Sequence, residues 1–171
     1  AVTPAATAAA AAPSATDRAQ AESQKLNAIF DEYFEEYLQQ NPILATSIGD
    51  PRYNDRFVVG ISPAAMAAEE KLHRDYLARL QTVDRAVLPT ADQLSYDIFK
   101  TGREREIEGF QFPDELIPLN QFYSTPNSFA QLGSGNGMQP FKTVQDYDNF
   151  LRRLDGFVAW TDQAIVNMKD G

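Results

Sequence analysis

The sequence predicts a mainly α-helical protein, built like a bundle of four long helices with one irregular segment between the third helix and the last. Two observations lead to this prediction. Apolar residues recur every three or four positions along four stretches of the chain, which is the period of an amphipathic helix. Ser, Thr or Ser-Pro, which favour helix starts, stand directly before three of these stretches.

The first helix is predicted over residues 17–40. Its apolar positions form a stripe wide enough to be covered from more than one side. It ends at Asn41, because the residue before a proline is disfavoured in the helical conformation. Residues 43–60 form a short, turn-rich connection. The apolar positions of the helix are Leu26, Ile29, Phe30, Tyr33, Phe34, Tyr37 and Leu38.

The second helix is predicted from Ser62, as N-cap with Pro63 in the first turn, to Val83. The third runs from Thr90 to Phe110, and Thr90 with Gln93 has the spacing of a capping box. The predicted buried positions of the second helix are Ala65, Ala68, Leu72, Tyr76, Leu80 and Val83.

The last helix has the clearest signal. Thr143 and Asp146 form another capping-box pattern at its start. One apolar face then continues almost to the end of the sequence. We predict that this face is buried; it consists of Tyr147, Phe150, Leu151, Leu154, Phe157, Val158, Thr161, Ile165 and Met168.

Between residues 112 and 142 the helical pattern stops at four prolines and a glycine cluster. A structureless loop of about 30 residues is improbable inside a compact domain. The segment is nevertheless apolar enough to need cover, so we expect it to pack on another part of a longer chain or on a partner. Residues 17–171 are therefore expected to be incomplete on their own. The apolar residues are Leu116, Ile117, Leu119, Phe122, Tyr123, Phe129 and Leu132.

Residues 1–16 form an Ala/Pro/Thr tract, which we predict to be a disordered linker left after removal of an export signal. No apolar run approaches the ~20 residues that span a bilayer. The absence of cysteine excludes a disulfide scaffold and is compatible with export. The net charge of −9 argues against nucleic-acid binding and against docking on anionic membranes.

The chain contains one histidine, His73, which excludes most catalytic constellations. A zinc site needs about three protein ligands, and a hydrolase triad needs a base beside its nucleophile. Glu69 and His73 share a helix face but have no third ligand nearby, so a solvated or salt-bridged histidine is expected. The acidic residues at 31–36 lack the Glu-x-x-His pairs with which helical bundles bind two metal ions, so we expect them to form a solvated helix face. We therefore assign no catalytic, cofactor-binding or metal-binding residue.

Several segments together resemble one bacterial family. They are FDEYFEEYL at 30–38 with the Asn-Pro that follows, ATSIGD at 45–50, YNDRF at 53–57, LSYDIF at 94–99, PLNQ at 118–121, and FKTVQDY at 141–147 before LRRL. Their order resembles the N-terminal part of the family known as domain of unknown function 885, which is related to zinc-dependent peptidases. The likeness covers about residues 25–171.

Family members are several hundred residues long and often carry an export or lipoprotein signal. Their zinc site is a His-Glu-x-x-His motif with an acidic ligand, downstream of this region, and no position here matches it. The resemblance implies the non-catalytic, N-terminal helical layer of a zincin-like, exported protein, either periplasmic or a lipoprotein anchored to the outer membrane. The implied partners are the rest of its own polypeptide and a peptide substrate, and the implied cofactor of the full-length protein is zinc.

The segment before the last helix is expected to line the substrate cleft. The candidate residues are Asn120, Gln121, Tyr123, Gln131, Gly133, Gly135 and Gly137. The alternative is a stand-alone helical protein-binding module without enzymatic activity, with residues 112–142 as its partner-facing surface.

Overall fold

A computed structural model describes residues 14–122 and 124–171, and these residues are mainly helical, as predicted. They contain six α-helices, three short 3₁₀ helices and no strand. The α-helices are α1 (Ala15–Gln40), α2 (Pro42–Ser47), α3 (Pro63–Leu80), α4 (Thr90–Gly109), α5 (Thr125–Leu132) and α6 (Val144–Asp170). The 3₁₀ helices are η1 (Pro51–Tyr53), η2 (Arg85–Val87) and η3 (Asp114–Leu116).

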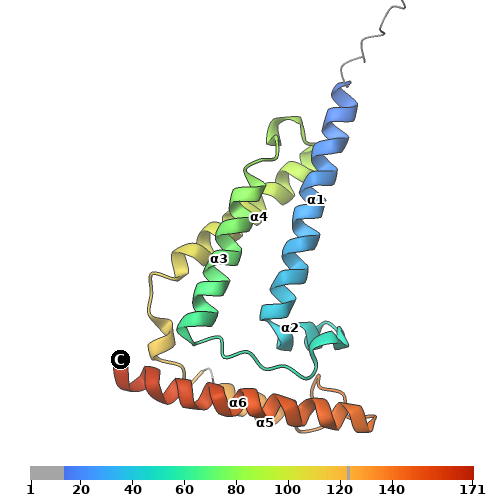
Figure 1. Ribbon diagram of the computed structural model, residues 1–171. Helices are drawn as coiled ribbons and strands as arrows, with labels where there is room; N and C mark the ends of the chain where they lie inside the picture. The colour runs from blue at the N-terminus through green and yellow to red at the C-terminus, as the bar shows by residue number, and fades with distance from the viewer. Residues whose placement is uncertain (1–13, 123) are drawn as a thin grey trace, which may run out of the picture.

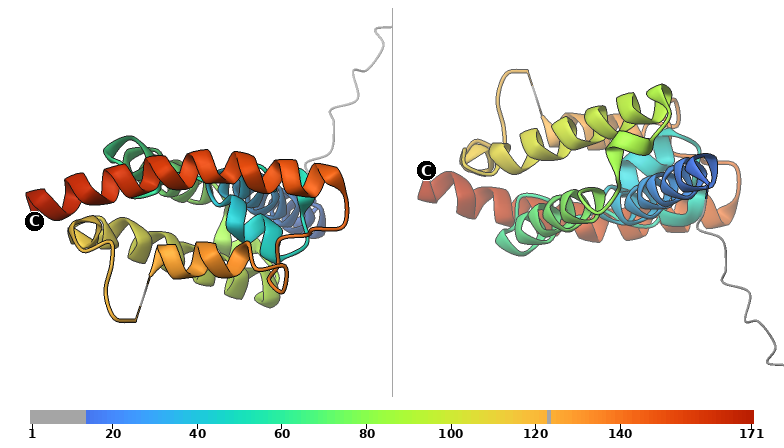
Figure 2. Two further views of the ribbon diagram at one scale, coloured as in Figure 1. Left: turned by 90° about the horizontal axis from the view of Figure 1, so that it is seen from below. Right: turned by 90° about the horizontal axis from the view of Figure 1, so that it is seen from above.

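Helices α1, α3 and α4 pack as a three-helix bundle, and α6 crosses the lower end of this bundle (Figure 1). Helix α5 lies beside α6, as the views from below and above show (Figure 2). The bundle encloses the largest apolar core, and α2 with η1 forms a smaller one. The larger core consists of Leu26, Ile29, Tyr33, Leu72, Tyr76, Leu80, Val83, Leu88 and Tyr96.

Helix α1 begins at Ala15, where Ser14 is the N-cap and Asp17 completes a capping box. Residues 14–16, predicted to belong to the linker, are therefore the cap and first residues of this helix, and residues 1–13 of that prediction lie outside the described residues. The chain leaves α1 at Asn41 as predicted, but it enters α2 immediately. The prediction missed α2 because Pro42 was interpreted only as a stop, whereas proline also suits the first turn of a helix.

The capping box predicted for α4 is wrong. The N-cap is Pro89, no side chain caps the helix, and the Gln93 amide instead donates to the carbonyl oxygen of Leu88 at 2.8 Å. The boxes at Ser14 and Thr143 are present. The difference arises because helix α4 begins one residue earlier than its sequence pattern suggests.

These caps give a matched pair of variants. We expect Thr143→Ala to lower the free energy of unfolding by about 1 kcal/mol, because it removes a cap hydrogen bond from the Asp146 amide. Thr90→Ala should change it by less than about 0.5 kcal/mol, since Thr90 lies inside the first turn of α4 and caps nothing. Urea unfolding followed by circular dichroism measures both. Equal losses in the two variants would contradict the assignment of the caps.

The segment 112–142 is only partly irregular, because it contains η3 and α5. The prediction that the helical pattern stops throughout is wrong for residues 125–132. Ser124 caps α5 and Pro126 lies in its first turn, so this proline starts a helix rather than ending one. Phe129 and Leu132 of α5 are buried against the rest of the fold.

Helix α6 has the predicted extent, but the predicted buried face is largely wrong. Of the nine residues in that face, six are exposed. The helix has two stripes, and the one that faces inward consists of Phe150, Arg153, Phe157, Trp160, Ala164 and Asn167. The apolar pattern alone could not decide between them, because each stripe follows the 3-4 spacing of a helix face.

Gly156 allows the chain at 56–60 to cross α6 closely. A Cβ atom at Gly156 would lie 2.5 Å from the Phe57 carbonyl oxygen, whereas a Cβ atom at Gly102 of α4 would meet nothing within 4 Å. Alanine in a helix interior gains about 0.5–1 kcal/mol over glycine, and overpacking costs about 1–3 kcal/mol. We therefore expect Gly156→Ala to destabilise by roughly 1 kcal/mol and Gly102→Ala to stabilise. Thermal unfolding of both variants tests this, and a stabilised Gly156→Ala would contradict the close crossing.

None of the helices in the described part of the chain combines the length and apolarity needed to cross a membrane.

Candidate functional site

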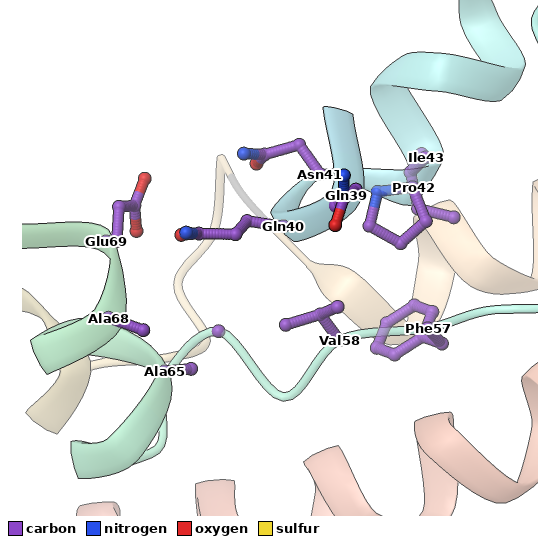
Figure 3. A pocket seen from close by; sticks show the side chains of 11 residues that line it. Gln39, Gln40, Asn41, Pro42, Ile43, Phe57, Val58, Ala65, Ala68 and Glu69 are labelled. Carbon is purple, nitrogen blue, oxygen red and sulfur yellow. The ribbon is translucent and has the colours of Figure 1, made fainter. Parts of the chain in front are cut away.

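A pocket of about 310 Å³ lies between the end of α1, helix α2, the crossing segment at 57–60 and the first half of α3 (Figure 3). We call it the amide pocket, because three amide side chains line it beside one carboxylate. The remaining wall is apolar. The lining residues are Gln39, Gln40, Asn41, Pro42, Ile43, Phe57, Val58, Gly60, Ala65, Ala68 and Glu69.

Polar and apolar side chains lie toward different ends of the amide pocket (Figure 3). Gln40 extends from α1 toward α3, where Glu69 lies, while Phe57 and Ile43 lie at the other end (Figure 3). The side chains of Gln39 and Gln40 form no hydrogen bond with residues 14–122 or 124–171. A primary amide carries both donors and an acceptor, so these side chains match the two sides of a peptide group.

The predicted burial of α3 was partly wrong at this pocket. Ala68 is exposed and Ala65 is half-buried, because both line the pocket rather than the core. His73, expected at the surface, is instead buried, with 1% of its area exposed. We expected His73 at the surface because histidine is polar. Its ring instead fits an aromatic pocket formed by residues of α1 and by Phe110, which follows α4.

His73 lies one turn from Glu69, and its Nε2 atom is 3.9 Å from a Glu69 carboxylate oxygen. The rings of Tyr33, Tyr37 and Phe110 surround the imidazole at centroid distances of 6.2, 6.4 and 6.2 Å. Within the described residues, neither ring nitrogen has a hydrogen-bond partner. Native proteins pair most buried polar groups, so this histidine is an exception that costs stability.

Burial lowers the pKa of His73, and the charge of Glu106 acts in the opposite direction. Burial also raises the pKa of Glu69, and the negative charge of Glu106 raises it further. His73 is therefore neutral at pH 7, and its contact with Glu69 is not an ion pair. In the described part of the chain, no group of three His, Asp or Glu side chains can hold a metal ion. These residues do not fit a zinc site.

A second pocket of about 450 Å³ adjoins the first, because Ile43 and Phe57 line both. We call it the α5 pocket. Its lining includes two of the residues predicted to line a cleft, Gln131 and Gly137. The full lining is Ile43, Phe57, Thr125, Ser128, Phe129, Gln131, Leu132, Gly137 and Met138.

The other predicted cleft residues do not line this pocket. Asn120 and Gln121 lie in an exposed turn, where the Asn120 Oδ1 atom accepts from the Phe122 amide at 2.8 Å. Gly133 follows the last residue of α5, and a Cβ atom there would lie 2.4 Å from the Phe150 ring. Gly135 lies in a turn and has a φ of 77°. Tyr123 lies outside the described residues. A role of these residues in a substrate cleft stays a prediction.

Arg153 lines neither pocket, but its guanidinium binds Pro42 of the amide pocket and Gln139, the residue after Met138 of the α5 pocket. Its side chain is completely buried, and it joins α6 to α2, to η1 and to the segment before α6. Burial lowers its pKa to about 10, and the charge of Asp55 opposes this shift. The guanidinium donates to five neutral acceptors: the carbonyl oxygens of Pro42, Tyr53 and Arg56, the Thr46 hydroxyl and the Gln139 side-chain oxygen.

The comparisons with known proteins identify the family. A family model described as "Bacterial protein of unknown function (DUF885)" matches residues 42–171. The chain belongs to the DUF885 family. No curated protein and no solved structure matches it. The resemblance expected from the sequence is thus confirmed from α2 onward, while the α1 residues quoted for it precede the matched region.

The DUF885 segment contains Arg153, both walls of the α5 pocket and most of the amide pocket. Sequence reasoning missed Arg153, although a signal for it exists. Arg153 lies three residues after Phe150, four before Phe157 and seven before Trp160, which places it on the inward stripe of α6. A charged residue at such a position is buried only when its polar atoms are paired, as they are here.

Proposed function

We propose that this DUF885 chain is the non-catalytic helical layer of a zinc-dependent, peptidase-like hydrolase, exported to the periplasm or anchored to the outer membrane as a lipoprotein. It packs against the catalytic part of its own polypeptide and contributes the amide pocket and the α5 pocket to the wall of a peptide-binding cleft. Zinc and its ligands belong to the catalytic part, since residues 14–122 and 124–171 contain no group of side chains that fits the metal.

The observation that carries this proposal is the apolar surface left without cover. Phe112, Ile117 and Phe122 are 61, 68 and 81% exposed. The sequence predicts that this segment needs cover, and α6 has an exposed apolar stripe of its own. Soluble monomers rarely expose large contiguous apolar patches, and such patches mark interaction surfaces.

The two pockets support a peptide as the bound molecule. The amides of Gln39 and Gln40 can pair with a peptide backbone, and Glu69 can accept a hydrogen bond from an amine or a peptide N–H. Ile43 and Phe57, which separate the pockets, offer an apolar surface to a side chain. Binding sites commonly combine an apolar lining with a few polar groups that orient the ligand.

The experiment uses the longest polypeptide that the gene encodes. We expect about one zinc per chain and hydrolysis of a mixture of short peptides that a chelator abolishes. Gln40→Ala should raise KM with little change in kcat, because it removes binding common to substrate and transition state. Gln111→Ala, exposed and outside the amide pocket, is the control. Zinc-free protein that hydrolyses no peptide would contradict the proposal.

The exposed apolar surface also favours a second candidate, a stand-alone protein-binding module without enzymatic activity. This module would bind its partner through residues 112–142, in which Phe112, Ile117 and Phe122 are the most exposed large apolar side chains that the structure describes. If the gene product proves inactive, zinc-free and associated with another protein that Phe122→Ser releases, the module replaces the hydrolase.

A further inference from the structure

Helix α6 carries an exposed apolar seam on the face next to its buried stripe. We call this seam the outer stripe; its members are 36–59% exposed, and Tyr147 at its start also packs against the Phe141 ring. Their spacing alternates between four and three residues, with Thr161 filling the one gap. That is the heptad spacing of a helix that packs against another helix. The outer stripe is Tyr147, Leu151, Leu154, Val158, Ile165 and Met168.

One flank of the outer stripe is mainly acidic. Asp148, Asp155 and Asp162 follow Tyr147, Leu154 and Thr161 and so repeat every seven residues, and Lys169 occupies the next position of this series. All three are exposed, and none forms an ion pair with a residue in the described ranges. Positions that flank an apolar seam decide which partner and which orientation a helix accepts.

We propose that the outer stripe docks a helix of the catalytic part that has its own apolar heptad seam and Lys or Arg residues facing the three aspartates. This inference rests on the proposed function and adds the chemistry of the partner. Opposite charges along the flank fix the register of the two helices, while the seam supplies the apolar burial.

The same flank disfavours two other occupants. In an antiparallel pair of copies centred on the stripe, Asp155 and Asp162 of one copy would face Asp162 and Asp155 of the other, which is repulsive, and only Asp148 would face an opposite charge, at Lys169. In a parallel pair of copies, the aspartates of one copy would face positions 150, 157 and 164 of the other. These positions pack inward and offer no partner for the aspartates. An anionic membrane surface repels an acidic flank, whereas helices that lie on membranes carry Lys and Arg there.

The charge preference is tested with a designed helix of about four heptads that has Leu in its seam and Lys in its flanks, against the same helix with Glu. We expect the Lys helix to bind this chain at least tenfold more tightly in fluorescence anisotropy. Asp148→Lys, Asp155→Lys and Asp162→Lys together should reverse the preference. Val158→Asp should abolish binding, and Leu94→Asp, exposed on α4, should not.

Equal binding of the two helices, or a preference that survives the triple substitution, would overturn the proposal. A reversible dimer in sedimentation that Val158→Asp abolishes would also overturn it, in favour of a second copy. All these residues are exposed, and an unchanged circular dichroism melting curve shows that each variant remains folded.

The source of the helix is tested in the full-length polypeptide by placing a cysteine at Leu151 and mapping maleimide labelling by peptide. We expect labelling to be at least tenfold slower than at Ser95→Cys on exposed α4, and equal after denaturation. Fast labelling in protein that hydrolyses peptides would overturn the docking proposal alone. Slow labelling in zinc-free, inactive protein would support the docking and contradict the proposed function.

Discussion

Arg153→Met is expected to lower the free energy of unfolding by at least about 3 kcal/mol, since each buried polar group left unpaired costs about 1–3 kcal/mol. Methionine fills much of the space but donates no hydrogen bond. Thr46, Gln139 and three carbonyl oxygens each lose a donor. Urea unfolding followed by circular dichroism and by the fluorescence of Trp160, the only tryptophan, measures the loss.

The adjacent Arg152 is the matched control. It is exposed and lies 3.8 Å from Asp55, a surface ion pair whose loss costs at most about 1 kcal/mol. Arg153→Lys separates charge from geometry, because an ammonium group has three donors and cannot reach five acceptors arranged around a planar fork. Equal stability of Arg153→Met and Arg152→Met would refute the role of Arg153 as the anchor of α6.

His73→Leu is expected to raise the free energy of unfolding by about 1–3 kcal/mol, because it removes two buried nitrogens that have no described partner. Leucine suits a site walled by Tyr33, Tyr37 and Phe110. His73→Gln, which keeps a buried amide, should give no such gain. Chemical denaturation at pH 7.5 compares the three proteins. Destabilisation by leucine would show that the imidazole has a favourable partner.

The same variant isolates a pH dependence. The folded-state pKa of His73 lies below its unfolded value of about 6.5, so below this pH the unfolded chain binds more protons. The free energy of unfolding of the wild type is therefore unaffected by His73 titration above pH 6.5 and decreases as the pH falls toward the folded-state pKa, by up to about 1.4 kcal/mol per pH unit.

Glu69 acts with the opposite sign. Its raised folded-state pKa gives stability below its unfolded value of 4.5, and this stability is lost as the pH rises through the folded-state pKa. Both proteins contain Glu69. Its contribution therefore cancels in the difference in unfolding free energy between wild type and His73→Leu, measured from pH 7.5 to 5.5. A constant difference across that range would contradict the lowered pKa of His73.

The four long helices could be predicted because their signals are local. Periodicity and caps such as Ser62 and Thr143 act within one or two turns. The short helices α2 and α5 were missed because Pro42 and Pro126 stop one helix pattern and start another, and six or eight residues show little periodicity. Helix boundaries otherwise differed by only a few residues.

The candidate site was harder to predict, because distant segments form it. The sequence predicted Gln131 and Gly137 as cleft residues, and both line the α5 pocket. The amide pocket, in contrast, joins the end of α1 to α3, and no local pattern shows that Gln40 and Glu69 line one pocket. The pattern of α6 contains two stripes and does not say which is covered. Arg153 decides this, and a lone arginine in a sequence is normally interpreted as surface charge.

The contacts of Arg153 also indicate when these pockets form during folding. Its hydrogen bonds to Arg56, Tyr53, Thr46 and Pro42 join residues 97 to 111 positions apart in the sequence. The α1, α3 and α4 core forms through shorter connections, and contacts between distant residues require costlier loop closure. We therefore expect the bundle to assemble first and α6 to dock late. A ligand of the two pockets would then bind only after α6 has docked. It would therefore slow unfolding rather than speed folding.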